Sequence, residues 1–403
     1  MSQAAGQGRA AVDGTQGRPC EGLVVLELGH SVAAPFVGQI LSELGARVVK
    51  VEKAEGDAAR GWGPPFVEGA AAIFQVLNRN KQSVVCDLRD AAQCAALRAF
   101  IHAEVDIVLQ NLRPGHVQAL GLDADTLRAA KPSLVYCNIG AFGRTGPLSE
   151  RPGYDPLMQA FSGIMSTTGE AGRPSVRVAS SIVDMGTGMW AVIGIQGALQ
   201  RRAQTGEGAT VDVSLFETAA TWMSLIAAQA RVEGVAPGRH GSGTASIVPY
   251  KAYRTRDGEV VVAAGSDGLF RRLCGVLGHP EWREDPRFAD NPGRVAHHQT
   301  LYGLLDPLFA EATSQEWVRR MEAAGIPCAP VNDVLQMLDH PQTRELGLLQ
   351  PVPGSALQVI GLPVSYDGER PAPRSAPPRL GEHTGQVLGR YTNTDRADPP
   401  NQE

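Results

Sequence analysis

The first third of the chain alternates short apolar runs with stretches of helical spacing. The apolar runs, which predict β-strands, cover residues 22–28, 47–52, 82–88, 105–109 and 134–138. Helical spacing occupies residues 35–45, which Pro35 opens and Gly45 closes, and residues 90–102. This alternation predicts a parallel β-sheet that is covered by helices on both faces.

The pattern changes from about residue 225. Two apolar runs, 250–254 and 259–263, flank Asp257-Gly258, which is typical of a β-hairpin, and three helical patterns follow. Beyond residue 330 the chain shows another helix, strands near 348–365, a proline-rich stretch over 371–378 and a short helix near Leu388. We therefore expect an α/β region over residues 20–220, a smaller α+β region over 225–325 and a last region over 330–403.

Composition limits the classes of function. The 403 residues are 43% hydrophobic and 20% charged, which excludes wholesale disorder. The formal net charge of −5 gives no overall basic surface for nucleic acid, so an anionic ligand needs locally placed cations. No apolar stretch reaches the ~18 residues of a membrane span, and residues 1–19 lack the apolar core of a signal peptide. We expect a cytoplasmic protein with a disordered tail over residues 1–19 that binds neither nucleic acid nor membrane.

Cysteine, histidine and glycine spacing indicates neither a metal site nor a dinucleotide site. The cysteines form no C-x-x-C pair, and they are Cys20, Cys86, Cys94, Cys137, Cys274 and Cys328. Most have apolar neighbours, as reduced thiols of a cytoplasmic core do. The nine histidines lack metal-ligand spacing. Gly186-Thr-Gly188 and Gly241-Ser-Gly243 do not follow the first strand, so we expect no nicotinamide cofactor.

Asp184 stands at the junction between an apolar run and a helical pattern over residues 185–204. One interpretation is a helix N-cap. The other is a nucleophile whose carboxylate the helix N-terminus keeps ionised, with Gly186 and Gly188 leaving room for a bulky electrophile. Both roles are compatible at this position.

A set of short motifs in a fixed order resembles the class III coenzyme A transferase family, also called the CaiB/BaiF family, which includes formyl-CoA transferase and α-methylacyl-CoA racemase. The motifs occupy residues 25–35, 44–53, 56–57 with 60–63, 78–81, 111–115, 153–155, 205–208 with 211–214, 325–328 and 380–384. No single motif is decisive, but their common order from about residue 22 to 390 is highly specific.

The resemblance implies a Rossmann-like large domain formed by both chain ends, so that residues 330–403 return to it, and a smaller inserted domain. It also implies a homodimer of interlinked rings. The implied activity moves CoA from an acyl-CoA donor, such as succinyl-CoA, to a small carboxylic acid. The chain would do so through covalent aspartyl anhydride and aspartyl-CoA intermediates at Asp184. CoA and acyl-CoA are then substrates, and no tightly bound cofactor is expected.

The resemblance also implies a set of CoA contacts. They are His30, Val32, Ala33, Lys53, Arg60, Cys86, Asp87, Leu88, Arg89, Asn111, Leu112, Arg113 and Tyr154. The cations Lys53, Arg60, Arg89 and Arg113 could meet the phosphates of CoA or could equally be solvated surface. Some relatives have glutamine at Val32 and arginine at Ala119. The loop over residues 238–243 loosely matches a glycine-rich loop that closes over the intermediates, and Arg239 and His240 could select the acid.

Two alternatives remain open. In the racemases of this family a histidine occupies the position of Tyr154 and pairs with the aspartate. A tyrosine hydroxyl is a poor base near neutral pH, so the sequence favours a transferase over a 2-methylacyl-CoA racemase or epimerase. The second alternative is an acyl-CoA-binding protein in which Asp184 has only a structural role.

Overall fold

The computed structural model describes residues 17–392, which divide into two compact units. Within these residues, unit 1 comprises 17–162, 179–225 and 342–392, and unit 2 comprises 163–178 and 226–341. The sequence pattern predicted that 163–178 and 330–341 belong to the large region, and the structure groups both segments with unit 2. Of the tail expected over residues 1–19, residues 1–16 lie outside the described part of the chain.

Unit 1 is built on a six-stranded sheet whose strands are all parallel. Its strands in chain order are β1 (Val24–Leu28), β2 (Arg47–Glu52), β5 (Lys81–Val85), β6 (Ile107–Gln110), β7 (Val135–Gly140) and β8 (Thr210–Ser214). They lie side by side in the order β5-β2-β1-β6-β7-β8. The chain thus adds strands on one side of β1 first and on the other side afterwards. In open parallel sheets, ligands bind at the carboxyl ends of the strands where the order reverses, which here is between β1 and β6.

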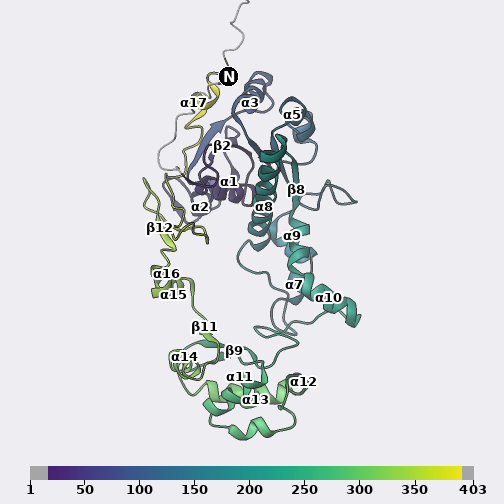
Figure 1. Cartoon of the computed structure of the whole chain (residues 1–403), viewed down its shortest axis with the longest axis vertical. Helices are drawn as coiled ribbons and strands as arrows, with labels where there is room; N and C mark the ends of the chain where they lie inside the picture. The colour runs from purple at the N-terminus through teal and green to yellow at the C-terminus, as the bar shows by residue number, and fades with distance from the viewer. Residues whose placement is uncertain (1–16, 393–403) are drawn as a thin grey trace, which may run out of the picture. The chain divides into compact units, whose positions relative to one another are not determined.

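Helices cover both faces of this sheet (Figure 1). On one face α1 (Ala33–Glu43) packs against α8 (Ile182–Thr205). On the other, α3 (Ala91–Glu104), α5 (Ala124–Ala130) and α17 (Thr384–Leu388) join a core that includes Leu26, Val49 and Val108. Because α17 contacts α3 and β5, the C-terminal segment belongs to the same unit as the N-terminal strands. The parallel α/β sheet predicted from the sequence is confirmed.

Shorter elements complete unit 1. They are η1 (Ala58–Gly61), β3 (Phe66–Val67), β4 (Ala70–Ala71), α2 (Ala72–Asn78), α4 (His116–Ala119), α6 (Asp155–Phe161), α9 (Leu215–Trp222), β12 (Leu349–Pro351) and β13 (Gln358–Ile360). Two helices cross the boundary between the units in sequence, α10 (Ser224–Glu233) and α16 (Pro341–Glu345).

Unit 2 has a three-stranded antiparallel sheet in the order β11-β10-β9. Its elements are α7 (Ile164–Thr167), β9 (Tyr250–Arg254), β10 (Glu259–Ala263), α11 (Asp267–Val276), η2 (Pro280–Glu284), α12 (Asn291–Ala296), α13 (His298–Phe309), α14 (Ser314–Ala323), β11 (Cys328–Pro330) and α15 (Val334–Asp339). β9 and β10 have the bounds that the hairpin pattern predicted. Tyr253 and Phe309 stack with ring centroids 4.2 Å apart inside an apolar core of the unit.

Helix α8 differs from the sequence-based expectation in length. The pattern predicted residues 185–204, and the helix has 24 residues that begin at Ile182. Within residues 17–392 it is also the one helix that is long and apolar enough to cross a membrane, with a mean hydropathy of 1.3 in its most apolar window. The apolar pattern of the sequence predicted no such stretch. In unit 1 the helix packs against α1, α9 and β8.

Candidate active site

The turn after β1 and the turn after β6 are joined directly at the switch point of the sheet. The backbone N–H of His30 donates to Asn111 Oδ1 at 3.0 Å, and Asn111 Nδ2 donates to the His30 carbonyl oxygen at 3.0 Å. Two bonds between one amide side chain and the backbone N–H and C=O of one residue fix the separation of the two turns. The backbone that would approach a ligand at this edge is therefore held in one conformation.

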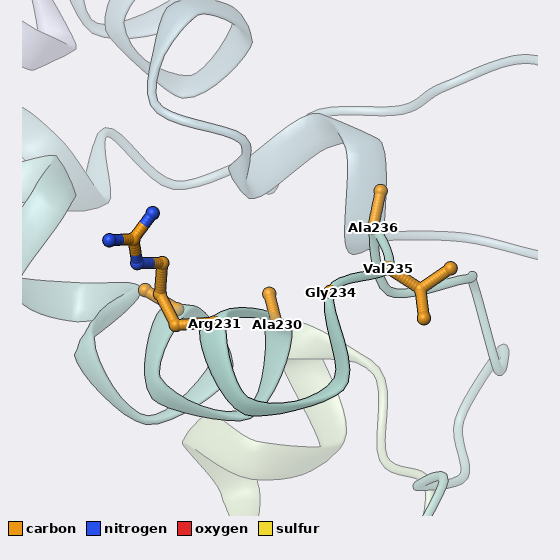
Figure 2. A pocket seen from close by; sticks show the side chains of 6 residues that line it. Ala230, Arg231, Gly234, Val235 and Ala236 are labelled. Atoms are coloured by element: carbon orange, nitrogen blue, oxygen red, sulfur yellow. The ribbon is translucent and has the colours of Figure 1, made fainter.

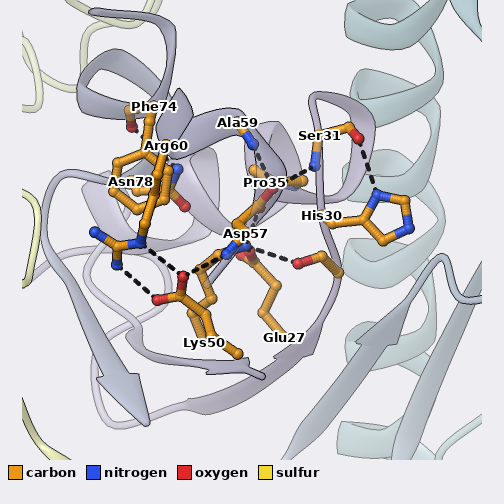
Figure 3. A network of polar contacts seen from close by, with 12 residues as sticks. Glu27, His30, Ser31, Pro35, Lys50, Asp57, Ala59, Arg60, Phe74 and Asn78 are labelled. Atoms are coloured by element: carbon orange, nitrogen blue, oxygen red, sulfur yellow. Dashed lines mark hydrogen bonds and ion pairs between the residues drawn. The ribbon is translucent and has the colours of Figure 1, made fainter. Parts of the chain in front are cut away.

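A buried charge network lies beneath the first turn (Figure 3). Glu27 of β1 accepts from Lys50 Nζ at 3.0 Å and from Lys81 Nζ at 2.8 Å, so one carboxylate faces two cations. Lys50 also pairs with Asp57 at 2.9 Å. The four side chains are almost completely excluded from water. Charges buried this deeply persist only when each has a partner, which this network supplies.

The network also binds the backbone of the first turn. Lys50 Nζ donates to the Gly29 carbonyl oxygen at 2.7 Å, and Lys81 Nζ donates to the Pro35 carbonyl oxygen at 2.8 Å. Asp57 Oδ1 accepts from the backbone N–H of Ser31 at 3.3 Å, and Ser31 has a left-handed φ of 69°. The charges of β1, β2 and β5 therefore shape the turn that follows β1.

Burial has opposite outcomes for the two lysines of the network. Desolvation, assisted by the charge of Lys50, lowers the pKa of Lys81 to about 8, although Glu27 opposes it. Desolvation also acts to lower the pKa of Lys50, but the carboxylates of Glu27 and Asp57 outweigh it and the net shift is upward. Lys50 is therefore the more firmly charged of the two cations.

The sequence-predicted CoA contacts follow four neighbouring strands, with one exception. His30, Val32 and Ala33 come after β1, Lys53 and Arg60 after β2, Cys86 to Arg89 after β5, and Asn111 to Arg113 after β6. All of these segments meet at the carboxyl edge of the sheet because the strands are parallel. Tyr154 is the exception, since it follows β7 and precedes α6, and its side chain is 55% exposed.

The predicted cations differ in how they are engaged. Arg60 donates to both carboxylate oxygens of Glu52, at 2.8 and 2.7 Å, and lies 3.9 Å from the ring centroid of Phe74. Lys53 and Arg89 are exposed, and their ion pairs with Glu55 and Asp87 lie at the surface. Arg113 is exposed and lies close enough for its charge to act on His30. Lys53, Arg89 and Arg113 are thus the accessible cations of this set.

Most of the other predicted CoA contacts have side chains that are buried or pack against the protein core. The side chains of Val32 and Ala33 are buried at the start of α1. Burial raises the pKa of the Cys86 thiol to about 11, which keeps it protonated. Leu88 and Leu112 pack against the core of the sheet. From these positions, a ligand would meet mainly backbone atoms.

Asp184 does not cap its helix, in contrast to one of the two roles that the sequence indicated. The N-cap of α8 is Ser181, and Asp184 is the third residue of the helix. The backbone N–H groups of Val183 and Asp184 instead donate to Asp155 Oδ2, at 2.8 and 3.2 Å. The carboxylate that serves the start of α8 therefore comes from α6.

The pKa of Asp184 is also shifted opposite to the expectation. Burial, together with the negative charge of Asp155, raises it from 3.8 to about 7. The positive end of a helix dipole favours an ionised carboxylate in the first turn, but here the Asp155 carboxylate occupies the backbone donors of that turn. The Asp184 side chain makes no hydrogen bond or ion pair with any other residue in the range 17–392.

Gly186 and Gly188 allow close packing and do not leave space for a ligand. A Cβ atom at Gly186 would lie 2.7 Å from Trp222 Cζ2, and one at Gly188 would lie 2.8 Å from Phe36 Cδ1. The expectation of room for an electrophile at these glycines was wrong because α9 and α1 fill it.

The loop over residues 238–243 lies in unit 2 and is tied to the turn after α7. The backbone N–H of Gly241 donates to the Gly169 carbonyl oxygen at 3.0 Å, and Arg239 Nη1 donates to Ser175 Oγ at 2.9 Å. Within residues 17–392, no group of three or more His, Cys, Asp or Glu side chains is arranged to hold a metal ion.

Sequence reasoning missed two features of this site. Glu27 and Lys50 stand inside apolar strand runs, and a charge at a buried strand position is a usable signal for an internal ion pair. Asp155 had no comparable signal. It precedes Pro156 at the start of a helix, so the sequence suggests a local cap and not a contact with residues 183 and 184.

Comparisons with known proteins identify the family. The model of the CoA-transferase family III matches residues 20–384. A succinate–glutarate CoA-transferase of Agrobacterium fabrum is 34% identical to this chain, and the match covers 95% of this chain and 98% of that protein. The human succinyl-CoA:glutarate CoA-transferase is 33% identical, and the match covers 94% of this chain and 88% of the human protein. The crystal structure of a CaiB/BaiF family protein from Brucella suis has a TM-score of 0.84 and 36% identity, covering 93% of this chain and 100% of that one. The chain therefore belongs to the CoA-transferase family III, also called CaiB/BaiF, and is a CoA transferase.

Proposed function

We propose that this enzyme moves CoA from succinyl-CoA to a small dicarboxylic acid, with Asp184 as the nucleophile. Both relatives described above are named for exchange between succinate and glutarate, which supports this donor and this class of acceptor. The observation that carries the covalent mechanism is the state of Asp184: a partly buried carboxylate at a fixed helix start, with no partner among the described side chains. A carboxylate that is not held by a cation is free to attack a carbonyl carbon.

The reaction then runs through acyl exchange on Asp184. Its carboxylate oxygen attacks the thioester carbon, the C–S bond breaks, and CoA thiolate leaves behind a mixed anhydride. The thiolate attacks the Asp184 carbonyl carbon and releases the donor acid, which leaves an aspartyl-CoA thioester. The acceptor carboxylate attacks this thioester, the C–S bond breaks, and CoA thiolate leaves a second mixed anhydride between Asp184 and the acceptor. The thiolate then attacks the acceptor acyl carbon of this anhydride, which forms the new acyl-CoA and releases the Asp184 carboxylate. The acyl group stays activated throughout, so no ATP is needed, and water must be excluded.

We place CoA along the carboxyl edge of the parallel sheet, at the switch point between β1 and β6. The support is the clustering of the predicted contacts after β1, β2, β5 and β6, together with the rigid turn that His30 and Asn111 share. Lys53, Arg89 and Arg113 are the accessible cations for its phosphates. Arg60, which is paired with Glu52 and lies over the ring of Phe74, would hold the segment after β2 in place. Selection of the acid by Arg239 and His240 stays a proposal.

The assay follows CoA exchange directly. The protein is incubated with succinyl-CoA and a panel of mono- and dicarboxylic acids, and new acyl-CoA esters are identified by mass spectrometry. We expect exchange with at least one dicarboxylate, and an adduct at Asp184 after trapping with hydroxylamine or borohydride. Turnover in D₂O should leave the α-carbon of a 2-methylacyl-CoA unlabelled, because Tyr154 replaces the histidine that a racemase would use. Deuterium uptake without exchange would favour the racemase alternative.

We further propose that the chain works as a homodimer. The helix α10 has no buried residue, and Leu225 and Val232 on it are 81% and 89% exposed. Figure 2 shows the end of this helix beside a hollow that is lined by Ala227, Ala230, Arg231, Gly234, Val235 and Ala236. On α8, Met185, Met189 and Ile193 form a second exposed apolar stripe. Apolar surface of this extent in a monomer is typical of an assembly interface.

Light scattering after gel filtration tests this assembly. We expect the mass of a dimer, twice 42.7 kDa, for the wild-type chain. Ile193→Glu places a charge on a side chain that is 57% exposed, so it leaves the folded unit intact and weakens association by at least tenfold. A wild-type protein that elutes as a monomer at micromolar concentration would contradict the proposal.

A further inference from the structure

Asp155 is held rigidly against the start of α8. Its side chain is 3% exposed, and its two carboxylate oxygens have different partners. Oδ2 accepts from the backbone N–H groups of Val183 at 2.8 Å and Asp184 at 3.2 Å. Oδ1 accepts from Gln159 Nε2 at 2.6 Å, and Gln159 is itself fully buried. These N–H groups are the second and third of α8, the ones that an N-cap side chain would normally take.

The rest of the first turn of α8 is equally fixed. Thr187 Oγ1 donates to the Val183 carbonyl oxygen at 2.7 Å and lies 2.9 Å from Thr218 Oγ1 on α9. Trp222 of α9 closes the space at Gly186. The backbone of Asp184 therefore has one position, which α6 and α9 determine from outside the helix.

Asp155 is also the charge that acts on Asp184. Among the described elements that pack against α8, Glu43 on α1 is paired with Arg79, Asp212 on β8 with Arg144, and Glu217 on α9 is bonded to Ser214. None of these groups contributes to the shift at Asp184, whose pKa is raised by burial and by Asp155 alone. Tyr154, next to Asp155 in sequence, adds no charge.

We propose that Asp155 is a positioning residue for Asp184: it fixes the first turn of α8 and, through its negative charge, keeps the Asp184 carboxylate strongly nucleophilic. The inference rests on the proposed function of Asp184. An oxygen nucleophile reacts faster as its basicity rises, so the charge of Asp155 would speed attack on the thioester. A neutral cap of the same shape would hold the helix but not supply this effect.

Asp155→Asn separates these two contributions, since Asn keeps an acceptor oxygen for the two N–H groups and loses the charge. We expect the acidic limb of the pH profile of kcat/KM to move at least one pH unit lower, and kcat at pH 8 to fall at least threefold. Asp155→Glu should bring the limb back toward its original position. Asp123→Asn is the matched control, because Asp123 caps α5 through Thr126 in the same unit and does not act on Asp184.

A second readout does not depend on turnover. In protein labelled with ¹³C at the aspartate side-chain carboxyl, the resonance that Asp184→Asn removes should titrate near pH 7 in the wild type and lower in Asp155→Asn. An unchanged limb and an unchanged resonance in Asp155→Asn would overturn the inference while an adduct trapped at Asp184 still upheld the proposed function. If Asp155→Asn does not fold, Gln159→Met tests the positioning alone, because it removes the donor to Oδ1 and keeps the charge of Asp155. The acidic limb should then stay in place while kcat falls at least threefold, and an unchanged kcat would overturn the inference.

Discussion

Asp184→Asn should abolish CoA exchange, with kcat falling by about 10⁴-fold or more, the usual effect of removing a covalent nucleophile. The amide has nearly the shape of the carboxylate but cannot form an anhydride with the acyl group. CoA affinity should stay within a few-fold of wild type, because the proposed CoA contacts follow β1, β2, β5 and β6 and Asp184 does not. The measurements are exchange between succinyl-CoA and a dicarboxylic acid, and CoA binding by calorimetry.

Stability provides the control for this variant. The pKa of Asp184 is raised in the folded state from 3.8 to about 7, so the folded protein binds this proton more tightly than the unfolded chain does. Its contribution to stability is present below about pH 4 and is lost as the pH rises to about 7. Ionising such a group at pH 8 costs up to about 4 kcal/mol, and partial exposure reduces this to about 1–3 kcal/mol. Asp184→Asn should therefore be more stable than wild type at pH 8, with little difference at pH 4.

An inactive variant that is at least as stable as wild type shows that chemistry, and not folding, was lost. Asp184→Ala should be equally inactive, and since Asp184 is not the N-cap of α8, it should lose no cap. Exchange activity in Asp184→Asn that is free of deamidation by mass spectrometry would contradict the nucleophile assignment. If the wild type binds CoA but exchanges none, and Asp184→Asn binds CoA equally well, the acyl-CoA-binding alternative, in which Asp184 is structural, would be favoured.

Glu27→Gln should lower the free energy of unfolding by about 3–5 kcal/mol, the cost of leaving a buried charge without its partner. Glu27 is the carboxylate that Lys50 and Lys81 share, and all three side chains have no exposure to water. Stabilities of domains are about 5–15 kcal/mol, so this is a large fraction of the total. Urea unfolding followed by circular dichroism measures it.

The pH dependence of the Glu27→Gln defect is specific to its cause. Lys81 already has its pKa lowered to about 8 by burial, and it should lose its proton more readily once Glu27 is neutral. The loss of stability should therefore shrink as the pH rises from 7 to 10. Glu55→Gln is the control, because its ion pair with Lys53 is exposed and should contribute less than about 0.5 kcal/mol. A Glu27→Gln protein as stable as the Glu55→Gln control would show that the network is not needed for folding.

The buried ion pairs of Glu27 with Lys50 and Lys81 stabilise the fold and also hold the turn after β1, where we place CoA. Because Lys50 and Lys81 donate to backbone oxygens on either side of the first turn, a Glu27→Gln protein that still folds should have that turn loosened. CoA affinity should then fall more than kcat does, since Asp184 lies on a different element.

Patterns within short stretches of the sequence were sufficient to predict several helices and strands and to identify the family. Period-two and period-3.6 hydrophobic spacing depends on neighbours within one strand or helix, so β2, α3 and the β9–β10 hairpin were found within two residues at each end. The ordered motifs led to the CoA-transferase family, which the comparisons confirmed. They also singled out Asp184 at the start of a helix, although its helix begins three residues earlier than the pattern indicated.

The chemistry around Asp184 was decided only by the tertiary structure. Its cap comes from Asp155, 29 residues away in the chain, and its pKa rises because the same carboxylate lies beside it in a partly buried place. The glycines that follow it proved to be packing positions because Trp222 and Phe36 approach from other helices. Capping, desolvation and ion pairing depend on which distant groups come within a few ångströms of each other. The sequence alone determined the helix that carries Asp184, and the fold determined what that carboxylate touches and how readily it ionises.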